Sequence, residues 1–174
     1  MQEGAYFVTI CTRNREIIFD RGSYRKIVEE CWFDLPKHYP HVELDEFVVM
    51  PNHIHSIVVL VGAGLKPVPV PPSTRAGLKP APTISNDGRN DIRHSLTEII
   101  RAFKTFSARR INDLRRTPGL SVWQRNYFEH VIRSEESLNK ILEYVFTNPG
   151  QWETDPENPT VQVSDAPLGK AVLF

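Results

Sequence analysis

Four stretches of the chain are rich in β-branched and aromatic residues and are bounded by turn-forming residues, a pattern typical of β-strands. The stretch at 53–61 is almost continuously apolar after its two histidines, as expected for a strand inside a sheet. It follows the stretch at 42–50 after only Pro51 and Asn52, so the two should form an antiparallel hairpin. The predicted strands cover residues 5–12, 42–50, 53–61 and 122–132.

Three other stretches repeat apolar residues at helical spacing. The longest covers 95–114, where Ser95 and Glu98 have the spacing of a capping box. A second helix covers 134–147, with Ser134 as its N-cap. A third covers 23–37 and must end near the prolines that follow it. The order of all seven elements predicts an α+β fold: a ferredoxin-like βαββαβ antiparallel sheet with an added C-terminal helix.

Residues 63–91 differ in composition from the rest of the chain. They are rich in Pro and Gly, and the segment at 63–69 recurs almost unchanged at 76–82. Short repeats of this kind do not build a core, so we expect a mobile loop. Beyond Trp152 the helical pattern ends in polar residues and prolines. The sequence therefore predicts one domain at 1–152, with the 63–91 insert, and a polar tail at 153–174.

The bulk composition is that of an ordinary globular protein: 174 residues, 40% of them hydrophobic, with a formal net charge of zero. No apolar run approaches the roughly 20 residues of a membrane-spanning helix, and no signal-peptide pattern is visible. Cys11 and Cys31 provide neither a disulfide framework nor a C-x-x-C metal pair. We expect a cytoplasmic protein with reduced cysteines and no membrane partner.

The charges are unevenly distributed along the chain. Between residues 93 and 116, seven basic residues stand against two acidic ones, a net of +5. Such a block is typical of surfaces that contact phosphate, and binding through it should weaken as salt rises. A solvated helix face explains the block equally well. The candidates for nucleic-acid contacts on the predicted helix are Arg101, Lys104, Arg109 and Arg110.

His53 and His55 lie two apart on a predicted strand, so both side chains point to the same face. Two imidazoles on a rigid strand can begin a metal site, although H-x-H alone is more often a pair of ordinary histidines. Tyr144 and Asn148 share one face at the end of the last helix. Asn148 would complete a site of N and O donors, which suits Mg²⁺ or Mn²⁺ at least as well as zinc. Alone, this pair is more often a tyrosine packed on the core and an asparagine helix cap.

Four motifs taken together carry a family resemblance. They are VMPNHIH at 49–55, FK at 103–104, VWQRNYFEHVIR at 122–133 and YVFTNP at 144–149. In this order, and on these elements, they closely resemble the REP-associated tyrosine transposases, a branch of the single-tyrosine HUH transposases. The resemblance spans residues 5–152 without the insert, and it implies a catalytic domain of ferredoxin-like fold.

The resemblance also implies an activity: metal-dependent, site-specific cleavage and strand transfer through a 5′-phosphotyrosine. The expected partner is single-stranded or hairpin DNA from repetitive palindromic elements, which places the protein at the nucleoid. His53 and His55 would hold a divalent metal ion, Mg²⁺ or Mn²⁺, with Asn148 as third ligand. Tyr144 would be the nucleophile. A monomer and a homodimer both stay open.

Other interpretations of the same residues also stay open. Tyr127 is the rival nucleophile, although an aromatic residue on a strand is usually packed against the sheet. Glu129 and His130 belong to the third motif, but no role is assigned to them. One alternative function is a domesticated DNA-binding protein of the same fold without cleavage activity. A replication or conjugation nickase is the other, and such enzymes usually carry further regions that 174 residues do not accommodate.

Overall fold

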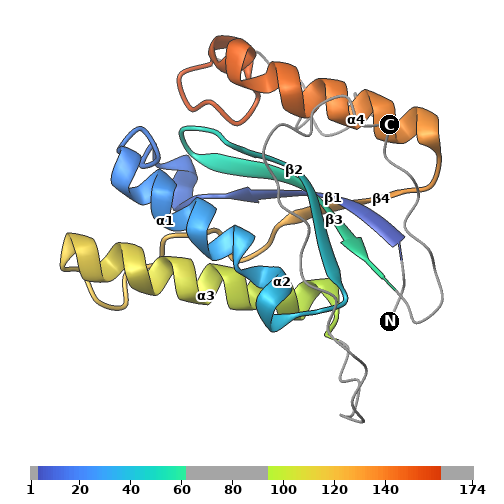
Figure 1. Ribbon diagram of the computed structural model, residues 1–174. Coiled ribbons are helices and arrows are strands. Elements are labelled where there is room, and N and C mark those ends of the chain that lie inside the picture. The colour runs from blue at the N-terminus through green and yellow to red at the C-terminus, as the bar shows by residue number, and fades with distance from the viewer. Residues whose placement is uncertain (1–3, 62–93, 162–174) are drawn as a thin grey trace, which may run out of the picture.

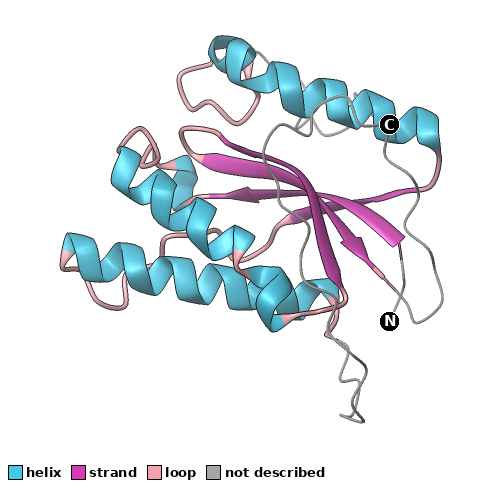
Figure 2. Cartoon of the chain, viewed as in Figure 1, coloured by secondary structure: helices cyan, strands magenta, loops and turns pink. Residues whose placement is uncertain are grey.

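The fold is a four-stranded antiparallel sheet with helices on both faces, which confirms the predicted α+β, ferredoxin-like arrangement (Figures 1 and 2). The computed structural model describes residues 4–61 and 94–161, so the insert predicted at 63–91 lies outside the described residues. The strands are β1 (Gly4–Cys11), β2 (Val42–Val49), β3 (His53–Leu60) and β4 (Phe128–Ile132), arranged in the order β2-β3-β1-β4. The α-helices are α1 (Gly22–Phe33), α2 (Leu35–His38), α3 (Leu96–Arg115) and α4 (Glu135–Thr147). Two 3-10 helices complete the described chain, η1 (Arg13–Arg15) and η2 (Asn148–Thr154).

Helices α1 and α3 cover one face of the sheet, below it in Figure 1. Their apolar sides pack on the alternate β1 residues Tyr6, Val8 and Ile10 in the main core. Trp32 of α1 and Phe103 of α3 meet edge to face there, with ring centroids 4.8 Å apart. The Ser95–Glu98 capping box predicted for the start of α3 is present in both directions.

Helix α4 covers the opposite face, above the sheet in Figure 1. Ile141 and Val145 pack on Phe7 of β1 and Ile57 of β3 in a smaller core. Side chains alternate between the two faces of a strand, so residues of odd number in β1 and β3 belong to this α4 side. His53 and His55 are therefore placed under α4.

Two predicted elements differ from the structure. The helix expected at 23–37 divides at Asp34 into α1 and the short α2, because Pro36 can stand only in the first turn of a helix. The strand expected at 122–132 begins only at Phe128. Before that point Trp123 makes a single β-bridge to Thr12. The carbonyls of residues 124–126 accept hydrogen bonds from the Lys104 ammonium, and not from a neighbouring strand.

The tail expected at 153–174 needs a correction over its first nine residues. Residues 153–161 fold back on the domain, and Asp155 and Asn158 are only 3% and 4% exposed. Two short-range hydrogen bonds shape this segment: Asp155 Oδ1 accepts from the backbone N–H of Glu157, and Asn158 Oδ1 accepts from that of Thr160. The part of the chain described by the structure includes no helix long and apolar enough to cross a bilayer.

Candidate metal and tyrosine site

The two histidines of β3 meet beneath α4. Their Nε2 atoms are 2.9 Å apart, and the side chains of His53 and His55 are almost completely buried. The register of the sheet sets them opposite Cys11 and Thr9 of β1. A central, fully paired strand thus holds both rings in place, as the sequence predicted.

Asn52 fixes the orientation of the first ring. Its amide nitrogen donates to the carbonyls of Arg15 and Glu157, at 3.1 and 2.6 Å, so its oxygen must face His53. That oxygen lies 2.8 Å from His53 Nδ1, which therefore carries the hydrogen and leaves the lone pair on Nε2. Burial, and secondarily the charge of Arg15, lower the pKa of His53 to about 3, so the ring is neutral at pH 7.

His55 is held in a similar way by Thr9, whose hydroxyl lies 2.8 Å from His55 Nδ1. Its ring also stacks on Phe7, with centroids 5.4 Å apart. When His55 Nδ1 donates to the hydroxyl, both Nε2 lone pairs face each other across 2.9 Å. In the other His55 tautomer the Thr9 hydroxyl donates to Nδ1, and His55 Nε2–H donates to His53 Nε2 across the same 2.9 Å. A cation between the two Nε2 atoms would take the place of that hydrogen.

Tyr144 reaches the histidines from α4. Its hydroxyl lies 3.3 Å from His55 Nε2, and its ring packs edge-on against Phe7 and His55. Burial raises the pKa of the Tyr144 phenol, and the nearby carboxylates of Asp155 and Glu157 raise it further. The Tyr144 phenol is therefore protonated at neutral pH in a site with no added positive charge.

Asp155 is the site residue that the sequence analysis missed. Its Oδ2 atom lies 3.8 Å from His53 Nε2, and together with one nitrogen of each histidine it forms a cluster within 4.8 Å. This oxygen is buried and has no hydrogen-bond partner among the described residues. Burial accordingly raises the pKa of the Asp155 carboxyl above its usual range.

Asn148 also lies at this site, as the sequence predicted. It is 2% exposed, and its Oδ1 atom is a second buried oxygen without a hydrogen-bond partner in the described chain. Its amide group lowers the pKa of the Tyr144 phenol and of the Asp155 carboxyl, which partly opposes the effect of burial on both. The Asn148 side chain is therefore close to both groups.

The residues present fit a divalent cation. Oδ2 of Asp155 lies in a cluster with the two imidazoles, and Oδ1 of Asn148 is a second buried oxygen nearby. Neither oxygen has a hydrogen-bond partner in the described chain, whereas buried polar atoms are normally satisfied. The 2.9 Å between the two Nε2 atoms also matches adjacent ligands on an octahedral ion, about 3 Å apart for bonds of about 2.1 Å. Nitrogen and carboxylate donors suit Mn²⁺, Zn²⁺ and, less well, Mg²⁺.

The η1 turn and the segment after Asp155 meet beside the site. Arg15 of η1 pairs with Glu157, with 2.9 Å between Nε and Oε2, and the Cys11 thiol lies 3.5 Å from the same oxygen. Pro156 directly follows Asp155, and Pro159 directly follows Asn158. Asp-Pro and Asn-Pro pairs are typical of turns in which the Asp or Asn side chain accepts a backbone hydrogen bond. This turn chemistry was the available signal for an ordered segment, although it does not indicate which residue approaches the histidines.

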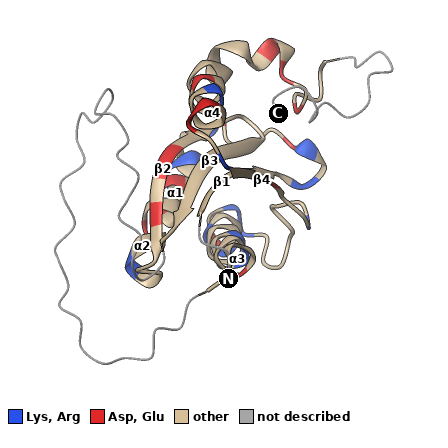
Figure 3. Cartoon of the chain, turned by 90° about the vertical axis from the view of Figure 1, so that its right-hand side faces the viewer, with Lys and Arg blue, Asp and Glu red and all other residues tan. Residues whose placement is uncertain are grey.

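The four basic candidates lie on the far side of the sheet from this cluster. Figure 3 shows α3, which carries them, on the opposite side from α4. The Lys104 ammonium donates to three backbone carbonyls, at 2.9 to 3.3 Å, and burial lowers its pKa to about 8. Arg110 pairs with Glu30 of α1. Arg101 and Arg109 are exposed, and their contact with DNA stays a prediction.

Tyr127, the rival nucleophile, also lies on the α3 side. Its hydroxyl donates to Glu129 at 2.7 Å and lies 3.2 Å from the hydroxyl of Thr97 on α3. Burial is the largest of the effects that raise the pKa of Tyr127 to about 12. The structure thus brings Tyr144, and not Tyr127, together with the two histidines.

Comparisons with known proteins place the chain in a family. No family model matches it. A protein of uncharacterized function from Haemophilus influenzae is 36% identical over 167 residues, covering 88% of this chain and 84% of that protein. The chain belongs to the family of that protein. Its fold is shared with a REP-associated tyrosine transposase that was solved bound to a REP hairpin, at a TM-score of 0.57 and 20% identity.

That comparison covers 87% of this chain and 69% of the transposase. A candidate transposase from Deinococcus radiodurans aligns with a TM-score of 0.43 and 16% identity, over 86% of this chain and 92% of that one. At these identities the likeness to the solved structures concerns the fold. The sequence relative therefore shows the family, and the solved transposase shows the fold.

Proposed function

We propose that this protein cuts and rejoins single-stranded or hairpin DNA in a metal-dependent reaction, with Tyr144 as the nucleophile. One observation carries the proposal. The Tyr144 hydroxyl lies 3.3 Å from His55 Nε2, within a buried group that also includes His53 and Asp155, although 89 positions separate the tyrosine from that histidine. A phenol beside a cluster of potential metal ligands has the parts that phosphodiester cleavage needs.

His53, His55 and Asp155 would hold the divalent cation, and the buried, unpartnered Oδ1 of Asn148 would be available as a further amide ligand. When bound, the cation supplies positive charge that favours the phenolate and neutralises the non-bridging oxygens of the scissile phosphate. Asn52 and Thr9 would keep the two ring orientations through the Nδ1 atoms. Asp155 is thus proposed as a ligand beside, or in place of, the predicted Asn148.

Tyr144 would form the covalent link. Its oxygen attacks the phosphorus, the bond from phosphorus to the 3′ oxygen breaks, and the phosphate remains on the tyrosine as a 5′-phosphotyrosine. The phenol loses its proton and the departing 3′ oxygen gains one. A 3′-hydroxyl can attack the same phosphorus in the reverse direction, so strand joining needs no nucleotide cofactor. The amide of Asn148, which lowers the pKa of the Tyr144 phenol, would help to orient the attacking oxygen.

The fold supports this proposal independently of the side chains, because the solved neighbour at a TM-score of 0.57 is a transposase that binds a DNA hairpin. The positions of the two tyrosines support it as well. Tyr127 is engaged by Glu129 and Thr97 on the other side of the sheet, whereas Tyr144 faces the histidines.

The test is formation of a covalent protein–DNA adduct. The protein is incubated with Mn²⁺ or Mg²⁺ and a pool of hairpin-bearing oligonucleotides with randomised single-stranded flanks, and the products are separated under denaturing conditions. We expect an adduct with the unmodified protein and with Tyr127→Phe, and none with Tyr144→Phe or in EDTA. An adduct that survives Tyr144→Phe would refute the assignment. DNA binding without any adduct would favour the non-cleaving, domesticated protein.

A further inference from the structure

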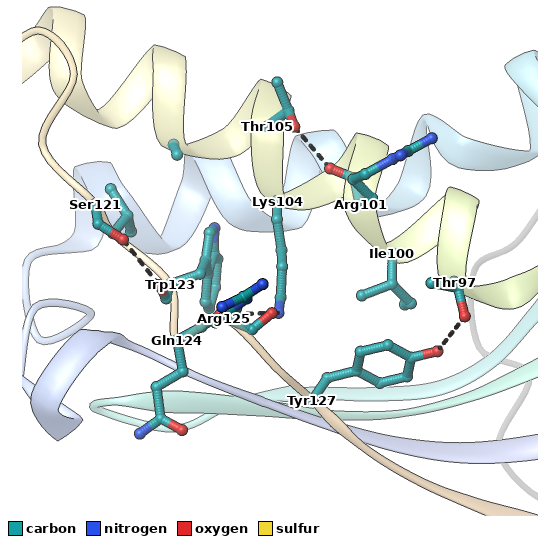
Figure 4. Close-up of a pocket in the computed structure, with 12 residues that line it drawn as sticks. Thr97, Ile100, Arg101, Lys104, Thr105, Ser121, Trp123, Gln124, Arg125 and Tyr127 are labelled. Carbon is teal, nitrogen blue, oxygen red and sulfur yellow. Dashed lines mark hydrogen bonds between the residues drawn. The ribbon is translucent and has the colours of Figure 1, made fainter.

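The third sequence motif, at 122–133, contributes residues to a groove that the proposed reaction does not use. One part of the groove lies between α3 and residues 121–125 and has a volume of about 330 Å³ (Figure 4). A second part, of about 530 Å³, is lined by Arg13, Asn14 and the same segment. Both parts share Ser121, Trp123, Gln124 and Arg125, so we treat them as one feature, the 121–125 groove.

The groove is basic. Its lining includes Arg13, Arg101, Lys104 and Arg125 and, in the described ranges, no Asp or Glu. Figure 4 shows the Lys104 side chain extended toward the backbone beside Arg125, where it holds the wall of the groove. Arg13 and Arg125 are exposed, and neither is paired with a carboxylate within the described chain. Unpaired guanidinium groups in a hollow without acids favour a polyanion.

The floor of the groove is rigid and mostly covered. Trp123 is 5% exposed and donates its indole N–H to Ser107 Oγ at 2.9 Å. A buried indole offers no open face on which a base could stack. In Figure 4 the Gln124 side chain points away from Lys104, and it lines the second part of the groove. The groove therefore suits contacts to a DNA backbone better than a stacked base.

The turn η1 connects the groove to the tyrosine site. Arg13 and Asn14 line the groove, whereas Arg15 pairs with Glu157 beside the histidines and its carbonyl accepts from Asn52. Asn14 and Arg15 have φ values of 54° and 55°, in the left-handed region that residues other than glycine rarely adopt. The backbone hydrogen bond from Gln124 to Cys11 adds a second link, since Cys11 lies opposite His53.

We infer that the 121–125 groove holds the single-stranded DNA that flanks the cleavage position, with Arg13 and Arg125 on its phosphates. This inference rests on the proposed function and adds the path of the DNA to it. A strand whose scissile phosphate lies at Tyr144 passes over η1 and enters the groove. The exposed amide of Asn14 and the half-buried amide of Gln124 then lie along that path. The two arginines belong to neither the metal cluster nor the basic set predicted on α3.

The test measures DNA binding apart from cleavage. Tyr144→Phe protein in EDTA is titrated against a fluorescein-labelled single-stranded oligo(dT), and the dissociation constant is followed by anisotropy over a range of salt concentrations. The groove variant is Arg13→Gln with Arg125→Gln. The comparison variant, Arg109→Gln, tests an exposed arginine of α3 that does not line the groove, and Lys26→Gln on α1 controls for the loss of an exposed positive charge.

Counterion release sets the expected size of the effect. Each phosphate contact to a single strand contributes about 0.7 to the slope of log K against log salt, so the groove variant should lose about 1.4. At about 50 mM salt the same relation gives about eightfold weaker binding for each arginine and about 60-fold for both. Lys26→Gln should leave the slope unchanged. The double variant Arg13→Lys with Arg125→Lys keeps both charges, so it should retain most of the parent's slope.

Several outcomes would overturn the inference. One is an unchanged slope in the groove variant, provided that its thermal unfolding matches that of the parent. Another is a loss that appears only in the Arg109 variant, which would place the DNA on the outer face of α3. If the groove variant binds normally and the Tyr144 adduct still forms, the groove assignment fails and the proposed function stands. Weakened binding with no adduct in the unmodified protein would keep the groove and remove the cleavage. No measurable binding by the parent would overturn both.

Discussion

Replacing Asp155 by Asn should affect the protein in opposite directions with and without metal. In EDTA the Asp155 Oδ2 atom is buried without a hydrogen-bond partner, 3.8 Å from His53 Nε2. The substitution removes the charge and keeps an oxygen for the Glu157 N–H. Because a buried charge without adequate partners is costly, we expect the free energy of unfolding of Asp155→Asn in EDTA to rise by about 1 kcal/mol.

With metal the sign reverses. A ligand present at about 100 times its Kd stabilises a protein by about 2.7 kcal/mol. Mutating a residue that hydrogen-bonds to a metal ligand typically lowers the metal affinity by about 10- to 100-fold. Loss of a carboxylate that binds the metal directly should therefore lower the affinity by at least about 100-fold. At the same metal concentration the variant would then gain only about 0.4 kcal/mol. The difference of about 2.3 kcal/mol corresponds to a Tm difference of about 5 to 9 °C for a chain of this size.

The assay is thermal unfolding in EDTA and over a titration with Mn²⁺, supported by calorimetric measurement of the Kd. Asn148→Ala is the matched variant, because Asn148 is the third ligand that the sequence predicted and has its own unpartnered Oδ1. If Mn²⁺ raises the Tm of Asp155→Asn as much as that of the parent, Asp155 is not a ligand. A normal response in Asp155→Asn together with a lost response in Asn148→Ala would return that role to Asn148.

Three further changes test the packing around the site. Lys104→Ala removes hydrogen bonds to three carbonyls, so urea unfolding should show a loss of about 2 kcal/mol, and the salt dependence of DNA binding should not change. Asn52→Ala removes the hydrogen bonds of the Asn52 side chain to the His53 ring and to two carbonyls. Calorimetry should then show an Mn²⁺ affinity lower by about 10- to 100-fold. An unchanged affinity would refute the role of Asn52 in orienting His53. Val145→Ala should cost about 2 kcal/mol in urea unfolding because Val145 is 2% exposed, whereas Phe146→Ala, at 78% exposed, should cost almost nothing. Equal losses from these last two variants would mean that α4 packs differently.

The sequence was sufficient to predict the fold because hydrophobic periodicity and element order largely determine it. The pair of histidines could be placed on one face from their spacing alone, and the apolar run after them indicated a strand inside the sheet. The extent of β4 could not be predicted, since the residues at 122–127 have strand-like composition. In the structure their carbonyls bind the Lys104 ammonium, a long-range contact that composition does not reveal.

Asp155 could not be predicted for a related reason. It lies in a polar stretch between prolines that has neither helical nor strand periodicity. Its position depends on η2, on the Arg15–Glu157 ion pair and on the amide of Asn52, which are contacts between segments more than 100 positions apart. The basic residues of α3 show the opposite problem. Their charge pattern is plain in the sequence, yet Lys104 and Arg110 bind partners within the protein.

The central claim is that the Tyr144 oxygen becomes joined to phosphorus, and peptide mass spectrometry tests it most directly. The adduct formed with Mn²⁺ and hairpin DNA is digested with nuclease and trypsin, and the peptide that carries the DNA remnant is sequenced by fragmentation. We predict a phosphate or a nucleotide on Tyr144 and an unmodified Tyr127. A remnant on any other residue, or an adduct that forms equally well in EDTA, would contradict the account.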